Sequence, residues 1–480
     1  MNDLSRRSFI GFGTAAAVAL PGIALAEGEG KEQATLDSLV GNVDVDYSTN
    51  PGTEQTLSVE EINAVRHAIV DRIVEDHVQD DGTVIPAVYV KVRELINTFS
   101  HGSGDGVKDG NWDEVMHYFS EDEAQAILEM PWGVLFTAQD FAAESGREEG
   151  ECEEICYELS LRGALYRMNR GNINYYHLNG YFHGLWEFGS LYHVYHRTSC
   201  EPLPIDHAPT REEFVEHFTD PAVVELCDMH TSQWGEMSTT VTATPFFYTH
   251  PVGQEVIKDG EKILPYDDWR AQVARHTIIA VSPCQCRMRR YAQDAWIYDG
   301  PCDHPIETCM SFGEFAEYYI ENGIGRQISQ EEATAIIEDA IDHGMVLESM
   351  YTKAQELFCF CHGDCCDILS GYVAKGDDIA FGAAGVKQMN VSHYLLDYDK
   401  DKCLKCGACV DRCPLFAIYM GEDGYPEVKP TCVRCGQCGL VCPADARKLT
   451  AREDVPYLPS SLLDDYNLKA SDRISHGVLE

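Results

Sequence analysis

Residues 403–443 decide the fold of the C-terminal part of the chain. This stretch begins with CLKCGACVDRCP (403–414), continues through a spacer and closes with CVRCGQCGLVCP (432–443). Each half is a C-x₂-C-x₂-C-x₃-C-P run, which is a typical spacing of ligands to [4Fe–4S] clusters. Three cysteines on one tight loop can occupy three corners of a cubane, and the fourth, before proline, ligates the other cluster. The duplicated run therefore predicts two [4Fe–4S] clusters.

The crossover of the fourth cysteine gives the two expected ligand sets. They are Cys403, Cys406, Cys409 and Cys442 for one cluster, and Cys432, Cys435, Cys438 and Cys413 for the other. A zinc ribbon would use two C-x₂-C pairs for one metal, and disulfides would leave the repeated Cys-Pro and the nearby glycines unexplained. Residues 397–450 resemble the bacterial-type ferredoxins with two [4Fe–4S] clusters, and we expect that fold there.

The N-terminus, MNDLSRRSFIGFGTAAAVALPGIALA, has the pattern of an export signal. Residues 5–10 resemble the twin-arginine motif, and Ala24-Leu25-Ala26 is an A-x-A cleavage site. We expect residues 1–26 to be a signal peptide for the twin-arginine route, which exports folded proteins to the periplasm or cell exterior. The apolar stretch is too short and glycine-rich for a good membrane anchor, and no later segment reaches transmembrane length.

The charge balance argues against nucleic acid as a partner. The chain has 36 Lys plus Arg against 79 Asp plus Glu, a formal net charge of −43. Nucleic acids and anionic membranes repel such a protein. We expect a redox partner protein instead, either exported or membrane-bound.

Residues 27–200 divide into three parts. Residues 27–55 are polar, acidic and rich in small residues, as in a disordered linker. Residues 56–112 form an N-terminal helical segment: a capping box at Ser58 and Glu61 begins one helix, and a second covers 87–99. Residues 113–200 carry helical signals at 121–130, 137–145 and 153–162, followed by a hairpin. This order resembles a winged helix-turn-helix, but the third helix is acidic where the DNA-reading helix is usually basic. We expect an interaction or packing module.

The middle region, 201–396, contains a second cysteine group. Its members are Cys284, Cys286, Cys302, Cys309, Cys359, Cys361, Cys365 and Cys366. We expect a mostly helical region with these cysteines on loops at helix ends, because residues 329–332 open a helix that runs to about His343. Eight thiolates suffice for two clusters, while four disulfides are the alternative in an exported protein. Closely set C-x-C and C-C pairs make poor disulfide partners, which favours one or two additional clusters.

Three arginines of this region and the four remaining cysteines of the chain have simpler interpretations. Arg287, Arg289 and Arg290 would offset the charge of a cluster. The remaining cysteines, Cys152, Cys156, Cys200 and Cys227, are expected to be core residues.

From about residue 115 the chain resembles a family of 4Fe–4S-binding proteins. That family has a winged-helix-like front, a cysteine-rich middle and a two-cluster ferredoxin at the end. After the ferredoxin-like part of this chain, we expect residues 451–480 to form a C-terminal tail. The match is carried by PCQCR (283–287), PIETC (305–309) and IGRQIS (324–329). The resemblance implies electron transfer. His362, Gly363 and Asp364 depart from it, since related chains have a denser cysteine run at this place.

Together these features predict an α+β multidomain protein that passes single electrons to or from a partner oxidoreductase. No dinucleotide fingerprint, P-loop or Ser/His/Asp signature is present, so no catalytic residue is assigned. One alternative is an oxidoreductase whose middle cluster binds substrate and is fed by the ferredoxin domain. Another is a cluster-based redox sensor.

Overall fold

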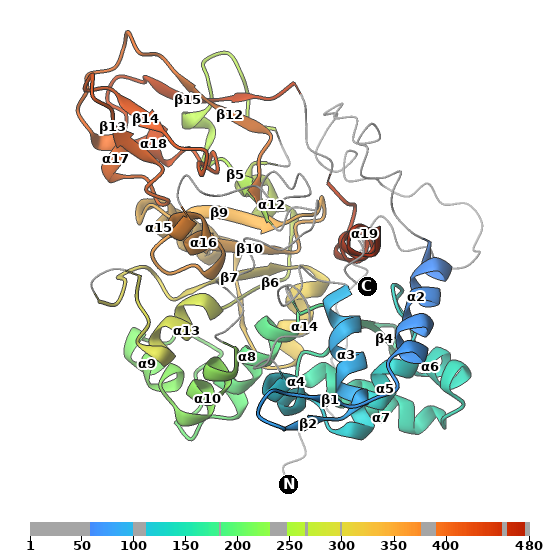
Figure 1. Cartoon of the computed structure of the whole chain (residues 1–480). Coiled ribbons are helices and arrows are strands. Elements are labelled where there is room, and N and C mark those ends of the chain that lie inside the picture. The colour runs from blue at the N-terminus through green and yellow to red at the C-terminus, as the bar shows by residue number, and fades with distance from the viewer. Residues whose placement is uncertain are drawn as a thin grey trace.

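The computed structural model of the chain describes residues 58–98, 112–181, 184–230, 247–264, 267–297, 300–375, 390–453 and 458–475. The expected signal peptide and linker lie outside the described residues. The described part mixes helices and strands and consists of an N-terminal helical region, a central sheet and a C-terminal region rich in short strands (Figure 1). Within it, no helix is both long and apolar enough to cross a membrane.

The elements of the N-terminal region include the expected helices and hairpin, and also two short strands and a helix at 112–118 that were not predicted. In chain order they are α2 (Val59–Arg72), β1 (His77–Val78), β2 (Val84–Ile85), α3 (Ala87–Thr98), α4 (Trp112–Tyr118), α5 (Glu121–Glu129), α6 (Ala138–Ser145), α7 (Glu149–Leu161), β3 (Leu165–Arg170) and β4 (Ile173–Leu178). The Ser58–Glu61 capping box is present at the start of α2. Strands β3 and β4 form an antiparallel hairpin. Cys152 and Cys156 are fully buried on α7, as expected of core residues.

The middle region is built on a sheet, which the expectation of a mostly helical middle did not include. The sheet has seven strands in the order β11-β5-β9-β10-β7-β6-β8. Their bounds are β5 (Phe247–His250), β6 (Ile279–Pro283), β7 (Glu307–Phe312), β8 (Arg326–Ile328), β9 (Val346–Met350), β10 (Leu357–Cys361) and β11 (Asn390–Val391). Every residue of β5, β6 and β9 is buried. Strands covered on both faces lack the alternating pattern that would have revealed them.

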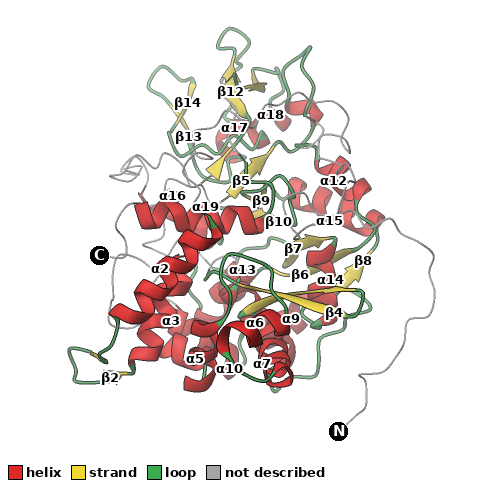
Figure 2. Cartoon of the chain, turned by 90° about the vertical axis from the view of Figure 1, so that its right-hand side faces the viewer, coloured by secondary structure: helices red, strands yellow, loops and turns green. Residues whose placement is uncertain are grey.

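Helices cover both faces of this sheet. They are α8 (Leu185–His196), α9 (Arg211–Phe218), α10 (Pro221–His230), the 3-10 helix η3 (Gln254–Val256), α12 (Trp269–Arg275), α13 (Gln285–Gln293), α14 (Glu314–Glu321), α15 (Gln330–Asp342) and α16 (Asp367–Lys375). Trp269 of α12 and Ile337 of α15 share a core with Phe358 on one face. On the other face, Phe315 of α14 and Leu191 of α8 pack with Cys309. Figure 2 shows α12, α14 and α15 against the strands of this sheet. The side chain of Ser329 caps α15, as its sequence predicts.

The C-terminal region contains two similar halves. Its elements are β12 (Tyr394–Tyr398), α17 (Ala408–Asp411), β13 (Ile418–Met420), β14 (Pro426–Val428), α18 (Gln437–Leu440) and β15 (Arg447–Ala451). Strand β12 pairs with β15, and β13 pairs with β14. The last helix, α19 (Leu462–Ser475), returns to α2 and α3 (Figure 1).

Candidate metal centres

Four of the predicted ligands in the C-terminal region surround one small cavity, which we call the inner site. They are Cys413, Cys432, Cys435 and Cys438. The cavity has a volume of about 20 Å³. Cys413 comes from the first cysteine run and the other three from the second, so the structure brings together the crossed set expected from the spacing.

The other set, Cys403, Cys406, Cys409 and Cys442, forms what we call the outer site. Cys442 lies close enough to Cys409 to raise the pKa of its thiol, although burial is the larger cause. The Tyr398 hydroxyl lies near Cys403 and lowers the pKa of its thiol, and Cys406 is exposed. The outer site is therefore more accessible than the inner one, whose Cys435 and Cys438 are buried.

Backbone amides point at the sulfurs in both halves. The amides of Lys405, Ala417 and Ala446 donate to the sulfurs of Cys403, Cys413 and Cys442 over 3.4, 3.3 and 3.2 Å. The loops that supply such donors need left-handed backbone, with φ of +56° at Lys405 and +80° at Gly407. Amide donors stabilise negative charge on sulfur. This donor set fits a [4Fe–4S] cluster held by thiolates.

Six of the eight middle-region cysteines surround a second cavity. They are Cys284, Cys286, Cys309, Cys359, Cys361 and Cys366. Their thiols lie next to one another in the order 284, 286, 366, 361, 359, 309. About 30 Å³ of space is left between them. We call this the six-cysteine cavity.

Strand alternation explains half of this cavity. Cys359 of β10 pairs directly with Cys309 of β7, and Cys361 lies two residues further along β10. Side chains two apart in a strand point to the same face. The other three cysteines lie at helix starts: Cys284 is the N-cap of α13, Cys286 lies in its first turn, and Cys366 directly precedes α16. The expectation of loops at helix ends is therefore wrong for Cys309, Cys359 and Cys361, which lie on strands.

The six-cysteine cavity also fits an iron–sulfur cluster. The amide of Leu369 donates to the Cys366 sulfur over 3.4 Å at the start of α16, where the helix dipole favours negative charge. The hydrogen bond to Cys359, together with burial, raises the pKa of the Cys361 thiol well above its ordinary value. Such thiols become thiolates when a metal binds. Six cysteines exceed the four that a cubane needs.

Cys302 and Cys365 lie outside the six-cysteine cavity. Their side chains lie next to each other, and the Arg287 Nη1 atom lies 3.7 Å from the Cys365 sulfur. Arg287 is thus placed to offset negative charge, as expected. Arg289 and Arg290 instead form ion pairs with Asp367, because that carboxylate is buried between their two guanidinium groups.

No disulfide joins any of the twenty cysteines, all of which lie within the described residues. Cys227 is fully buried, as expected of a core residue, and Cys200 is partly buried.

Sequence reasoning missed the polar groups beside these cysteines. Glu348 of β9 is fully buried opposite Cys359 and lies against Cys361 and Cys366. Burial raises the pKa of Glu348 to about 8. His304, His362 and Asp364 meet beside Cys365. The only local signal in the sequence was the departure from the family's cysteine run at residues 362–364. No signal pointed to Glu348, because strand pairing, rather than sequence spacing, brings it to the cysteines.

The turn that contains His362 connects the middle region to the inner site. The Gly363 amide donates to the Pro414 carbonyl over 2.8 Å, and Pro414 directly follows Cys413. The His362 ring lies 5.8 Å from that of Phe416. On the opposite side of the inner site, the Val252 amide donates to the Cys435 carbonyl over 3.0 Å. The inner site is therefore packed against the middle region.

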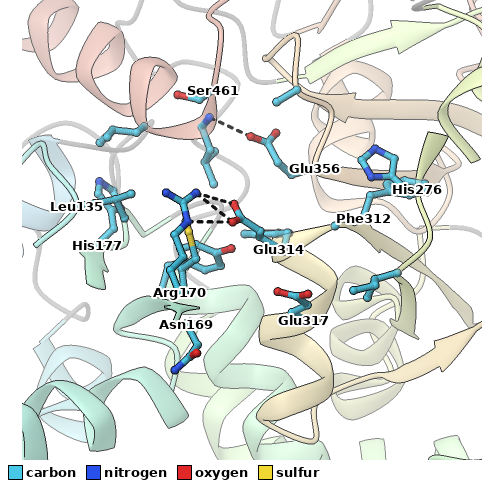
Figure 3. Close-up of a pocket in the computed structure, with 18 of the residues that line it drawn as sticks. Leu135, Asn169, Arg170, His177, His276, Phe312, Glu314, Glu317, Glu356 and Ser461 are labelled. Carbon is cyan, nitrogen blue, oxygen red and sulfur yellow. Dashed lines mark hydrogen bonds and ion pairs between the residues drawn. The ribbon is translucent and has the colours of Figure 1, made fainter. Parts of the chain in front are cut away.

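A larger cavity, of about 580 Å³, lies where the N-terminal hairpin, the sheet and α19 meet (Figure 3). Its lining is mainly apolar. An Arg170–Glu314 ion pair crosses it, and Glu356 accepts a hydrogen bond from the Leu462 amide over 3.2 Å. Phe312 and Glu356 line it at the ends of β7 and β10, three residues from Cys309 and Cys359, which is roughly 10 Å along a strand.

Comparison with known proteins identifies one domain. Residues 396–419 match the 4Fe-4S binding domain family, and this stretch contains Cys403, Cys406, Cys409 and Cys413. No curated protein and no solved structure matches the chain. The chain thus contains a 4Fe–4S binding domain, which supports an iron–sulfur electron-transfer role.

Proposed function

We propose that the chain passes single electrons between a partner oxidoreductase and its middle region through [4Fe–4S] clusters. The observation that carries this proposal is the order of the cysteine sites. The outer site includes the exposed Cys406, the inner site packs against the middle region, and the His362 turn joins the inner site to the six-cysteine cavity. Three clusters in this order would form one path for electrons.

The partner would dock at the outer site. Leu404, next to Cys403, is 66% exposed and offers an apolar contact beside the cysteines. The strongly acidic chain favours a partner with a basic surface. In this proposal the protein is exported by the twin-arginine route and works in the periplasm or cell exterior, on the evidence of residues 1–26.

The winged-helix-like module would serve to pack the structure rather than to bind nucleic acid. Its Arg167 donates to the Asn322 side chain over 2.7 Å, and Tyr318 of α14 donates to the Ser160 carbonyl over 2.8 Å. These buried contacts join the module to the middle region. Its third helix, α7, has five exposed or half-exposed acidic residues, which would repel phosphates.

Metal and sulfide analysis of the anaerobically purified full chain tests the proposal. We expect about twelve irons and twelve sulfides, four of each per cubane, and a stepwise reductive titration. The triple variant Cys284→Ser, Cys286→Ser, Cys366→Ser leaves three cysteines in the cavity, and it should lose about four of each and keep the spectrum of the C-terminal clusters. Unchanged iron in that variant would remove the middle cluster from the path. An unchanged rate of electron exchange with a soluble mediator in a Cys406→Ser variant would remove the outer site as the entrance.

The cavity of about 580 Å³ favours a second candidate function, an oxidoreductase that reduces a small, mostly apolar molecule. Electrons would reach that molecule along β7 and β10 from the six-cysteine cavity. Reduced methyl viologen should then be oxidised only when an acceptor compound is added. A Leu463→Trp variant, which fills the cavity, should stop this turnover and leave the cluster content unchanged; dye oxidation at the same rate in the variant would exclude the cavity as the substrate site.

A further inference from the structure

A group of potential metal ligands that are not all sulfur lies beside the six-cysteine cavity. Its members are Cys302, His304, Asp364 and Cys365. The ligand atoms of His304, Asp364 and Cys365 lie within 4.8 Å of one another, and His304 Nε2 is 3.1 Å from Asp364 Oδ2. The Cys302 side chain lies next to that of Cys365. Two short loop segments, 302–304 and 364–365, thus bring four ligands together.

One of these side chains has an unused coordinating atom. His304 is 6% exposed, and its Nδ1 atom has no hydrogen-bond partner among the described residues. A buried polar atom without a partner costs about 1–3 kcal/mol. An ion bound through Nδ1 would relieve this cost, whereas an ion bound through Nε2, the atom that faces Asp364, would leave Nδ1 unpaired.

The distances suit one tetrahedral ion. Zinc binds thiolates at about 2.3 Å and imidazole or carboxylate at about 2.0–2.2 Å, which separates neighbouring ligand atoms by roughly 3.3–3.8 Å. His304 Nε2 and Asp364 Oδ2 are 3.1 Å apart, and the ligand atoms of His304, Asp364 and Cys365 lie within 4.8 Å of one another. Cys302 lies next to Cys365. Iron–sulfur clusters are held mainly by thiolates, whereas mixed sulfur, nitrogen and oxygen ligands suit zinc.

The charges also balance around a divalent cation. Two thiolates and the Asp364 carboxylate carry three negative charges, while Arg287, fully buried, contributes one positive charge 3.7 Å from the Cys365 sulfur. A divalent ion supplies the remaining two. His362 Nδ1 lies 2.9 Å from the other oxygen of Asp364, a partner that would orient the carboxylate.

We propose that Cys302, His304, Asp364 and Cys365 bind one zinc ion without inorganic sulfide. The ion would join the loop at 302–304 to the turn at 364–365 and so hold Gly363 against Pro414, at the contact between the middle region and the inner site. The inference rests on the proposed function only in assigning the middle cluster to the six-cysteine cavity. The sequence pattern offered Cys302 and Cys365 as cluster ligands, and this inference assigns them to a structural metal instead.

The test uses the anaerobically purified full chain after dialysis against a chelator. We expect one zinc per chain, and X-ray absorption at the zinc edge should show two sulfurs at about 2.3 Å and two lighter atoms at about 2.0–2.2 Å. His304→Ala should lower zinc affinity at least tenfold and leave iron and sulfide unchanged. The matched control is His343→Ala, because the His343 ring lies 6.4 Å from that of His304 and outside the ligand group.

Two results would overturn the zinc site. One is the absence of bound zinc from the wild-type chain. The other is a loss of iron and sulfide together in His304→Ala, which would assign these residues to a cluster. Asp364→Asn, which preserves the shape of the side chain, should also weaken zinc binding and guards against a folding defect in the alanine variant. Failure of the proposed electron path would show instead as missing sulfide in the wild-type protein with zinc still bound.

Discussion

The C-terminal region and the middle region both gather cysteines around small cavities, but they do so by different means. In the C-terminal region, two loops of local sequence bring four sulfurs to each site, with backbone amides aimed at them. In the middle region, six sulfurs come from two paired strands and the starts of two helices, over residues 284–366. Spacing alone specifies the first arrangement, while the second exists only when the sheet is formed.

This difference should make the two regions respond unequally to loss of one cysteine. Each C-terminal site has four sulfurs for a cluster that needs four, so Cys438→Ser should lose about four irons and four sulfides. The six-cysteine cavity has two more sulfurs than a cubane needs. Single serine substitutions there, made one at a time, should leave iron content unchanged at two positions or more. Iron and sulfide per chain, measured for the whole series, provide the comparison; full loss at all six positions would mean that none is spare.

The same difference explains how far the sequence could go. The crossed ligand sets follow from spacing, and the structure places Cys413 with Cys432, Cys435 and Cys438. Capping boxes predicted the starts of α2 and α15. The central sheet could not be predicted, because fully buried strands such as IAVSP and VLESM carry no alternation. The proximity of Glu348 to the cysteines depends on that sheet, and sequence separation hid it.

Acid should destabilise the middle region more than the C-terminal region. Burial lowers the pKa of His250, in the sheet, to about 4, whereas residues 397–450 contain no histidine. A histidine with a lowered folded-state pKa stabilises the fold above pH 6.5, and this contribution is lost as the pH falls towards 4. The loss between pH 7 and 4.5 is about 2–3 kcal/mol.

Urea unfolding followed by tryptophan fluorescence measures this effect, since Trp269 packs in the core of the sheet. His250→Gln should reduce the difference in free energy of unfolding between pH 7 and 4.5. Burial gives His177 and His276 similarly lowered pKa values of about 4. They also contribute to the pH dependence of the free energy of unfolding, so the variant removes only the contribution of His250. An undiminished pH dependence in the variant would show that His250 does not contribute.

The contact between the two regions can be weakened at Gly363. A Cβ atom there would lie 2.6 Å from the Pro414 carbonyl oxygen, so Gly363→Ala must shift backbone and should cost about 1–3 kcal/mol. It should also slow electron transfer between the inner site and the middle cluster in stopped-flow reduction. Gly150→Ala is the control, because a Cβ there meets nothing within 4 Å. Equal reduction rates in the two variants would place the electron path elsewhere.

The smallest expected effects concern two buried arginines, one in each region. Arg447, 1% exposed, donates a hydrogen bond to Cys409, and Arg287, fully buried, lies against Cys365 and close to Cys284. A positive charge near a cluster favours its reduced form, so removing it lowers the reduction potential. Arg447→Met should therefore lower the potentials of the C-terminal clusters by tens of millivolts, on the order of 1 kcal/mol per electron, and leave the middle cluster unchanged. Arg287→Met should lower the potential of the middle cluster and leave the potentials of the C-terminal clusters unchanged. Redox titration followed by electron paramagnetic resonance separates the signals; if either variant moved all of them equally, the two cysteine regions would not be separate redox centres.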